Sequence, residues 1–495
     1  MAIPGLRLLQ WVHRWLGIAG CLLFAAWFLS GLVMMYVGFP SLTEAERWAG
    51  LSPLRLADAT ISPAAAMATL PATARAAPPR HIRLETMWTE RGPEPVWRIV
   101  DAAGERHTVS AGDGRPLGPT SAAQAQVIAR EFSRQAAAQW LETLERDQWT
   151  VPQGLNRLRP LHRIAIADAA GTELYVSSRS GEVVRDTTRH ERFWNWLGAV
   201  PHWIYFTTLR AEPPLWHNVV VWVSGACIAS AITGLVLGVV RLRLRRRRGI
   251  TPYRGWMAWH HVAGLVGGIF VLTWIASGWL SMSPNGWFAD DGVDAPALAR
   301  FQGAMAPGDI TWPAAAPAGT WREMSPLVFG GRPLLQWRDG AGTAIVTDAV
   351  TGKPARLTRA DMAQSAGRMW PGVSVSQVLL LTQEDAHWYS HHDSRLLPVW
   401  RVVLDNAVWL HIDPASGQIL DSSTPDSRLQ RWLFNAAHTL DFPWLIHHRP
   451  AWDIVVWLLA LGGLTTSVSG IVIGWRHLRR PSRKRRRSRI HPTIV

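Results

Sequence analysis

Cysteine is nearly missing from this 495-residue chain, and acidic residues are nearly missing from its apolar segments. The two cysteines are Cys21 and Cys227. They cannot build a disulfide-rich scaffold, and neither lies in a CxxCH motif that would attach haem covalently, so a bound haem would be of the b type. Outside residues 38–214 and 283–450, the sequence has one acidic residue, Asp453.

Four apolar stretches are each long enough to cross a bilayer core of about 30 Å. They comprise residues 16–37, 215–240, 257–282 and 452–475. The first is too long for the apolar region of a signal peptide and lacks a small-residue cleavage site, so we expect it to be retained. The sequence therefore predicts an integral membrane protein with four transmembrane helices.

The distribution of charge predicts the orientation of these helices. Residues 38–214 carry 20 basic and 19 acidic side chains, residues 283–450 carry 13 and 16, and the rest of the chain carries 18 basic side chains and one acidic side chain. Because Lys and Arg near span ends favour the cytoplasmic side, we expect both termini to be cytoplasmic and both large loops to face the periplasm or the cell exterior. The basic runs 241–248 and 476–489 then indicate topology and contact with anionic lipid rather than with nucleic acid.

The predicted spans divide the chain into eight segments. The first is the N-terminus with the first span, and the rest alternate between loops, spans and the cytoplasmic tail. Their boundaries are residues 1–37, 38–214, 215–240, 241–256, 257–282, 283–451, 452–475 and 476–495.

The chain also contains an internal repeat. An offset of 247 aligns His13 with His260 and Trp27 with Trp274, and an offset of 236 aligns His202 with His438. Both copies run from span to loop to span and start on the same side of the membrane. We therefore expect two parallel repeats related by a pseudo-two-fold axis along the membrane normal.

Both loops have patterns typical of small α+β modules. In the first loop we expect a helix over residues 121–145, because this stretch is rich in Ala, Gln, Glu and Leu and contains no Gly or Pro. Antiparallel meanders are predicted at residues 163–167, 173–177 and 182–184 and again at 400–404, 408–412 and 418–420.

The chain resembles the PepSY-associated transmembrane-helix proteins, and this resemblance implies a location in the bacterial inner membrane. The resemblance rests on residues 13–17 (HRWLG), on the meander turns at 178–183 and 413–419, and on the Trp-rich segments carrying His202 and His438. It implies two periplasmic PepSY-like domains and a ferric-siderophore reductase with two b-type haems. Since the chain carries no flavin domain of the kind fused to some relatives, its donor would be a separate cytoplasmic flavin reductase or a membrane quinol.

The matched histidines are the candidate haem ligands. An iron with two axial imidazoles suits electron transfer, and the repeat predicts one ligand from each copy: His13 with His260 near the cytoplasmic side, and His202 with His438 near the periplasmic side. Other pairings stay open, and so does a role for His13 and His260 as solvated interfacial residues. The candidate partners for haem propionates are Arg14, Arg192, Arg428 and His261. Arg14 fits the positive-inside rule equally well, and a surface position is the alternative for His261.

Glycines form a stripe below both span histidines. Gly17 and Gly20 follow His13, and Gly264 and Gly267 follow His260 at the same spacing. They would leave room for a flat macrocycle, or they would let helices pack closely as small residues do in membranes.

A histidine-rich stretch in the second loop has no counterpart in the first. His387, His391 and His392 lie among Glu384, Asp385 and Asp393, but their spacing matches no closed zinc motif. We interpret the stretch as a solvated loop and as a candidate substrate contact. Two other functions compete with the reductase: a haem-free PepSY scaffold or sensor that binds a periplasmic protein, and a transporter with parallel repeats.

Overall fold

The computed structural model describes residues 4–135, 137–242, 250–288, 292–305, 310, 316–391 and 394–479. They form two compact units. The helical unit contains the described residues of Met1–Leu32, His217–Pro284 and His448–Val495, and the sheet unit contains those of Val33–Trp216 and Asn285–His447. Each unit is considered by itself.

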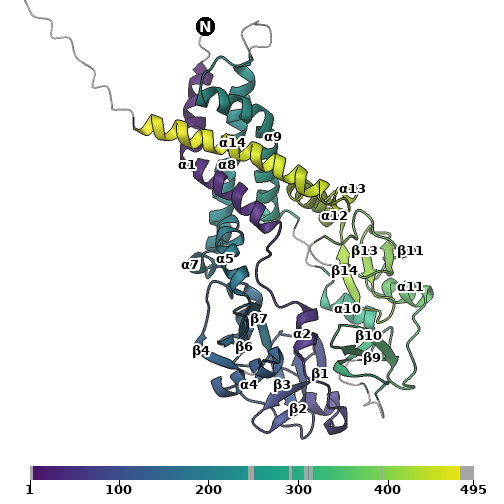
Figure 1. Ribbon diagram of the computed structural model, residues 1–495. Coiled ribbons are helices and arrows are strands. Elements are labelled where there is room, and N and C mark those ends of the chain that lie inside the picture. Colours follow the sequence, from purple (N-terminus) through teal and green to yellow (C-terminus); the bar gives the residue numbers. More distant parts are fainter. Residues whose placement is uncertain are drawn as a thin grey trace, which may run out of the picture. The chain divides into compact units, whose positions relative to one another are not determined.

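Four long helices make up the helical unit (Figure 1). They are α1 (Pro4–Met34), α8 (Pro213–Val240), α9 (Trp256–Ser281) and α14 (Ala451–Leu478). Each is long and apolar enough to cross a membrane, which confirms the four predicted spans. The sequence predicts a first span that begins at residue 16, after His13. Because α1 begins at Pro4, His13 lies inside the helix.

The helices contact one another through glycines in a pattern that both repeats share. Gly234 of α8 lies against the His13 ring of α1, and the equivalent Gly470 of α14 lies against the His260 ring of α9. The next contacts around the bundle also match, because Gly238 of α8 faces Leu265 of α9 while Gly474 of α14 faces Ile18 of α1. Equivalent residues therefore make equivalent contacts in the two halves.

The sheet unit contains three antiparallel sheets. The six-stranded sheet has the order β10-β9-β8-β1-β2-β3, with β1 (His81–Thr89), β2 (Gly92–Val100), β3 (Arg106–Ser110), β8 (Trp321–Phe329), β9 (Arg332–Asp339) and β10 (Ala344–Asp348). The other sheets are meanders. They consist of β4 (Ala138–Leu144), β5 (Leu161–Ile166), β6 (Glu173–Ser177) and β7 (Val183–Thr187), and of β11 (Val375–Leu381), β12 (Val399–Leu404), β13 (Trp409–Ile412) and β14 (Ile419–Ser423).

A helix packs on each meander and closes its core. Helix α4 (Ala122–Ser133) buries Ile128 and Ala129 against the first meander, and α11 (Arg359–Gly367) buries Met362 against the second. Shorter elements connect these parts. They are α2 (Glu44–Gly50), α3 (Pro63–Ala68), α5 (Arg189–Leu197), α6 (Ala199–His202), α7 (Thr207–Arg210), α10 (Ala295–Gln302), α12 (Pro425–Arg431), the π-helix η5 (Trp432–Ala436), α13 (Pro443–Ile446) and the 3₁₀ turns η1 (Leu56–Asp58), η2 (Gln153–Leu158) and η3 (Pro284–Gly286).

The predicted helix over residues 121–145 is wrong in its second half. Helix α4 ends at Ser133 because Arg134 adopts a left-handed conformation with φ 54°. The following residues form the edge strand β4, which pairs with β5 from Ala138 to Leu144. Pairing with a neighbouring strand thus outweighs the helix propensity of Ala, Gln and Glu, which is a weak preference of under about 1 kcal/mol per residue.

The second difference is the six-stranded sheet. The sequence predicts strands at residues 80–84, 96–100 and 107–109, where β1, β2 and β3 lie, but not their pairing with strands of the second loop. Strands β1–β3 come from the first loop and β8–β10 from the second, and they join where β1 pairs with β8. In this pair Leu84 lies opposite Met324 and Glu85 lies opposite Glu323. Two carboxylates directly opposite each other repel, so the junction needs cations.

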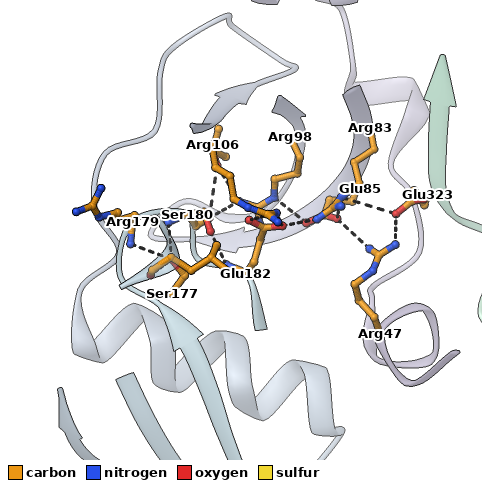
Figure 2. A network of polar contacts seen from close by, with 12 residues as sticks. Arg47, Arg83, Glu85, Arg98, Arg106, Ser177, Arg179, Ser180, Glu182 and Glu323 are labelled. Carbon is orange, nitrogen blue, oxygen red and sulfur yellow. Dashed lines mark hydrogen bonds and ion pairs between the residues drawn. The ribbon is translucent and has the colours of Figure 1, made fainter. Parts of the chain in front are cut away.

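Figure 2 shows the arginine–glutamate network that supplies them. It comprises Arg47, Arg83, Arg98, Arg106, Glu85, Glu182 and Glu323. Arg47 Nη2 lies 2.5 Å from Glu323 Oε2, and Arg83 Nε lies 3.2 Å from Glu85 Oε2 and 3.8 Å from Glu323 Oε2. Arg83 thus contacts both carboxylates of the junction.

Glu182 ties the first meander to the same network. Its carboxylate binds Arg83 and lies 3.1 Å from Arg106 Nη1. Burial alone would raise the pKa of Glu182, but the guanidinium groups of Arg83, Arg98 and Arg106 hold this pKa well below its ordinary value. The carboxylate therefore stays charged inside the protein, where an unpaired charge is costly.

We expect Arg83→Met to destabilise the sheet unit by about 3–5 kcal/mol, because it leaves buried carboxylates without their shared cation. Arg106→Met is the matched control. This arginine is more exposed and contacts Glu182 alone among the carboxylates, so its loss should cost at most about 1 kcal/mol. Denaturant unfolding followed by near-ultraviolet circular dichroism compares the two, and equal losses would contradict a central role for Arg83.

Asp186 of β7 generates a prediction about pH. Burial, with Glu46 and Glu191 nearby, raises its pKa to about 7. A folded-state pKa above the unfolded value means that the stability contribution of this group is fully present below pH 4 and is lost as the pH rises through 7. Asp186→Asn should therefore stabilise β7 at pH 8, by about 1–2 kcal/mol after allowance for partial exposure, and have little effect at pH 5. Hydrogen exchange of β6 and β7 at both pH values tests this, and an equal effect at both would contradict it.

Candidate functional site

Two histidines of the helical unit face each other. The ring centroids of His13 in α1 and His260 in α9 lie 6.3 Å apart, and the ring planes are inclined by 37°. Metal–imidazole bonds of about 2 Å, with about 1 Å from each nitrogen to its ring centre, separate two axial imidazoles by about 6 Å. The spacing is thus that of two ligands on opposite sides of one metal.

Hydrogen bonds to the neighbouring helices fix the tautomer of both rings. His13 Nδ1 lies 3.0 Å from the carbonyl oxygen of Ser230, and His260 Nδ1 lies 3.1 Å from that of Thr466. A carbonyl oxygen only accepts, so each Nδ1 carries the hydrogen and donates it. Nε2 then carries the free lone pair. A neutral imidazole binds a metal through such a nitrogen.

A cavity of about 730 Å³ lies beside these rings within the helical unit. Its size falls in the range of about 300–1,000 Å³ typical of ligand and cofactor pockets. All four long helices contribute to its lining. The lining includes Gln10, His13, Gly17, Cys21, Phe24, Ser230, Gly234, His260, Gly264, Val271, Thr466 and Gly470.

The glycines that follow His13 and His260 have two roles: some leave space in the cavity, and others let helices pack closely. Gly17 and Gly264 line the cavity, where an added Cβ would have no atom closer than 3.8 Å. Gly20 and Gly267 instead allow close packing, since a Cβ on Gly267 would lie 3.2 Å from the backbone of Gly462. Space for a ligand and helix packing thus alternate along one helix face.

Cationic side chains line part of the same cavity. Arg14, a predicted propionate partner, is joined by Arg241, Arg254 and Arg476. The sequence analysis did not single out these three: Arg241 and Arg476 belong to the basic runs interpreted as topology signals, and Arg254 lies between the second and third spans. Guanidinium groups bind carboxylates through paired hydrogen bonds, so this lining is suited to the acidic groups of a ligand.

His261, a predicted propionate partner, lines the same cavity and has both ring nitrogens bonded within the protein. Its Nε2 lies 2.9 Å from the carbonyl oxygen of Gly238, and its Nδ1 lies 2.8 Å from Thr251 Oγ1. The residue is buried and not a surface group. Because both nitrogens are bonded within the protein, His261 links α8 to the start of α9.

The second pair of matched histidines meets in the sheet unit. His202 and His438 have ring centroids 6.1 Å apart, with planes inclined by 72°. His202 ends α6, and His438 follows the π-helix η5 and stacks on Phe434 at 5.2 Å. The structure therefore brings together both histidine pairs that the repeat predicted.

The chain positions these two rings by different backbone devices. In the first repeat Gly198 separates α5 from α6, with φ −101° and ψ −105°. In the second repeat the equivalent stretch is the π-helix, a rare form often found near functional sites. In both repeats the regular α-helical hydrogen bonding is therefore interrupted just before the histidine.

Arg192 and Arg428, also considered as propionate partners, bind the backbone instead. Arg192 donates to the carbonyl oxygens of Thr187 and Gly171, and Arg428 donates to those of Ser423 and Ala407. Both side chains therefore attach the helix that follows a meander to that meander. The prediction of a ligand contact is replaced by a structural role that the two repeats share.

The stretch interpreted as a solvated loop is packed and paired. Trp388 is 2% exposed and stacks on His411 at 4.4 Å, and Asp385 forms two hydrogen bonds with Arg401. His391 Nδ1 lies 2.8 Å from Asp441 Oδ1. The solvated-loop interpretation is therefore wrong, because these polar groups already bind one another.

The candidate substrate residues of this stretch differ in their surroundings. His387 lies edge-on to Trp409 and Trp432, with ring centroids 5.4 Å and 6.0 Å away. His392 and Asp393 lie outside the described residues. Across the part of the chain that the structure describes, no cluster of three His, Cys, Asp or Glu side chains is arranged to hold a metal ion.

Comparison with protein families identifies the family of this chain. The family profile described as "PepSY-associated TM region" matches residues 10–371. That range includes His13, His202 and His260, while His438 lies beyond it. No curated protein matches the sequence. Since the match extends over most of the chain and the structure has the four apolar helices and antiparallel sheets expected of it, the protein belongs to the PepSY-associated transmembrane family.

Proposed function

We propose that this protein is a dihaem membrane reductase that moves electrons across the inner membrane to a ferric chelate of the siderophore type in the periplasm. The observation that carries the proposal is the pairing of matched histidines, one from each repeat, at 6.3 Å and 6.1 Å. A chance arrangement would not place both pairs at the spacing of two axial imidazoles.

The residues of the helical unit fit a b-type haem. His13 and His260 would be the axial ligands, Gly17 and Gly264 leave open space beside them, and arginines of the lining are placed for propionates. Haem b bound there would supply one-electron transfer. The protein's own part is to hold both rings in the Nε2-ligating tautomer and to surround them with apolar helices.

His202 and His438 are the proposed ligands of a second haem. Their support is the ring spacing and the stacking of His438 on Phe434, which restricts the rotation of that ring. Two centres would divide a membrane crossing of about 30 Å into shorter distances. The orientation with cytoplasmic termini, and a separate flavin reductase or quinol as donor, belong to the same proposal.

The runner-up is a haem-free scaffold that binds a periplasmic protein. One observation favours it. The sheet edges β4 and β11 expose apolar side chains, namely Trp140 and Leu141 on β4 and Leu379 and Leu380 on β11. Exposed edges of this kind accept an extra strand from a partner peptide. The two functions differ in whether the purified protein carries an absorbing cofactor.

A reduced-minus-oxidised absorption spectrum of the detergent-purified protein, with haem counted per chain, tests the proposal. We expect about two b-type haems in the wild type and the loss of one in each of His13→Ala and His202→Ala. His217→Ala, which changes a histidine without a matched partner, is the control and should keep both. A correctly inserted wild-type protein without haem would contradict the reductase function and favour the scaffold function.

A pair of glycine substitutions tests the ligand geometry more finely. A Cβ at Gly234 would lie 2.6 Å from His13 Cε1, whereas one at Gly470 would lie 3.5 Å from His260 Cε1. Gly234→Ala should displace the His13 ring from the Ser230 carbonyl and lower haem occupancy at this site severalfold, while the fold persists because the ring can move. Gly470→Ala should retain haem. Equal occupancy in the two variants would contradict the role of the His13 hydrogen bond.

A further inference from the structure

The helices that precede the second histidine pair expose the same apolar face in both repeats. In α5 this face consists of Phe193, Trp196 and Leu197, and its equivalent in α12 and η5 consists of Leu429, Trp432 and Leu433. Their exposed fractions are 59%, 50%, 51%, 48%, 41% and 37%, in that order. Large side chains exposed together in this way mark an interaction surface.

Each face belongs to an amphipathic helix. The three positions follow the i, i+3, i+4 spacing of one helix side. The opposite side is buried at equivalent positions, by Asn195 in α5 and Arg431 in α12. Asn195 donates to the carbonyl oxygen of Gly38, and Arg431 donates to that of Asp441. One side of each helix is thus fixed to the sheet unit, and the apolar side faces outward.

We propose that these two faces lie in the boundary between lipid headgroups and acyl chains. Helix α5 ends at Leu197 and the membrane helix α8 begins at Pro213, while η5 ends at Ala436 and α14 begins at Ala451. A short segment of chain therefore connects each apolar face to a membrane helix. Trp, Phe and Leu beside basic residues such as Arg189 and Arg428 are the composition of interfacial helices.

The duplication favours a bilayer over a protein partner. A membrane is a uniform plane that meets both repeats of one chain in the same way, and so it selects the same exposed positions twice. A single partner protein has a defined shape and would contact the two repeats differently. The lipid surface is thus the occupant that explains why position 193 matches 429 and position 196 matches 432.

This inference gives the second histidine pair a fixed place. His202 and His438 follow the two faces within the same short segments, so anchoring α5 and η5 in the interface holds both rings at the membrane surface. The inference does not depend on haem being bound there, and it would stand if the proposed reductase function failed.

Site-directed spin labelling tests the proposal. Single cysteines replace Phe193, Leu429, Leu197 or Leu433 in a full-length background with Cys21→Ala and Cys227→Ala. The labelled proteins are reconstituted in phosphatidylcholine–phosphatidylglycerol vesicles, and collision rates with oxygen and with a water-soluble nickel chelate are measured. Val266→Cys, on an exposed part of the membrane helix α9, is the lipid control, and Val350→Cys, at an exposed position after β10, is the water control.

We expect all four positions to collide with oxygen nearly as often as position 266, and with the nickel chelate several-fold less often than position 350. Collision with the nickel chelate at the rate of position 350 would show that the faces are in water and overturn the proposal. Protection from both reagents would show that protein covers them, either another part of this chain or a second copy, and would also overturn it. Agreement between the two labels of each helix guards against a misfolded single variant.

Discussion

The hydrogen bond from a histidine ring to a backbone carbonyl of the neighbouring helix is the interaction on which the helical unit depends. An imidazole among apolar helices needs a partner for its N–H, because an unpaired polar group in such surroundings costs several kcal/mol. His13 finds it at Ser230 and His260 finds it at Thr466. His13 reaches its carbonyl because α8 has a glycine, Gly234, at the point of contact, while the equivalent Gly470 leaves ordinary contact distance to the His260 ring. The same bond sets the tautomer, directs Nε2 away from that carbonyl, and thereby makes two ordinary histidines suitable as metal ligands.

In the sheet unit, a comparable constraint falls on the charged junction between the two loops. Opposed glutamates at the centre of a sheet are unfavourable unless cations stand between them, and Arg47 and Arg83 do so. The network makes β1 and β8 dependent on each other, so the two loops complete one sheet although a membrane helix pair separates them in the sequence. A buried charge network of this kind also specifies register. Moving β8 by one residue would turn Glu323 to the other face of the sheet and leave both guanidinium groups with too few partners.

Much of this could be predicted because the signals are periodic or duplicated. The four spans follow from their length and apolar composition, and His13, His260, His202 and His438 stand out because the repeat matches them. The failures have local causes. Residues 138–144 have a helical composition, but the ladder with β5 makes them a strand. The pairing of β1 with β8 is set by contacts between residues more than two hundred positions apart, which no local pattern reveals. Arg192 and Arg428 were assigned to a ligand because sequence does not show that backbone carbonyls of their own meanders accept their hydrogen bonds.

The two repeats agree closely where a residue meets its own counterpart and differ elsewhere. At the histidine pairs each ring faces the matched ring of the other repeat, so a change in one copy alters the surroundings of both, and the two positions are constrained together. The stretch around Trp388 is under no such constraint. Its contacts with His411 and Arg401 lie entirely within the second repeat, and position 175, which corresponds to His411, is a buried tyrosine bonded to Asp147. The second meander could therefore acquire a packed arrangement of Trp, His and Arg side chains without disturbing the first. A difference between the two meanders in what they recognise would arise most readily from this unshared part of the sheet unit.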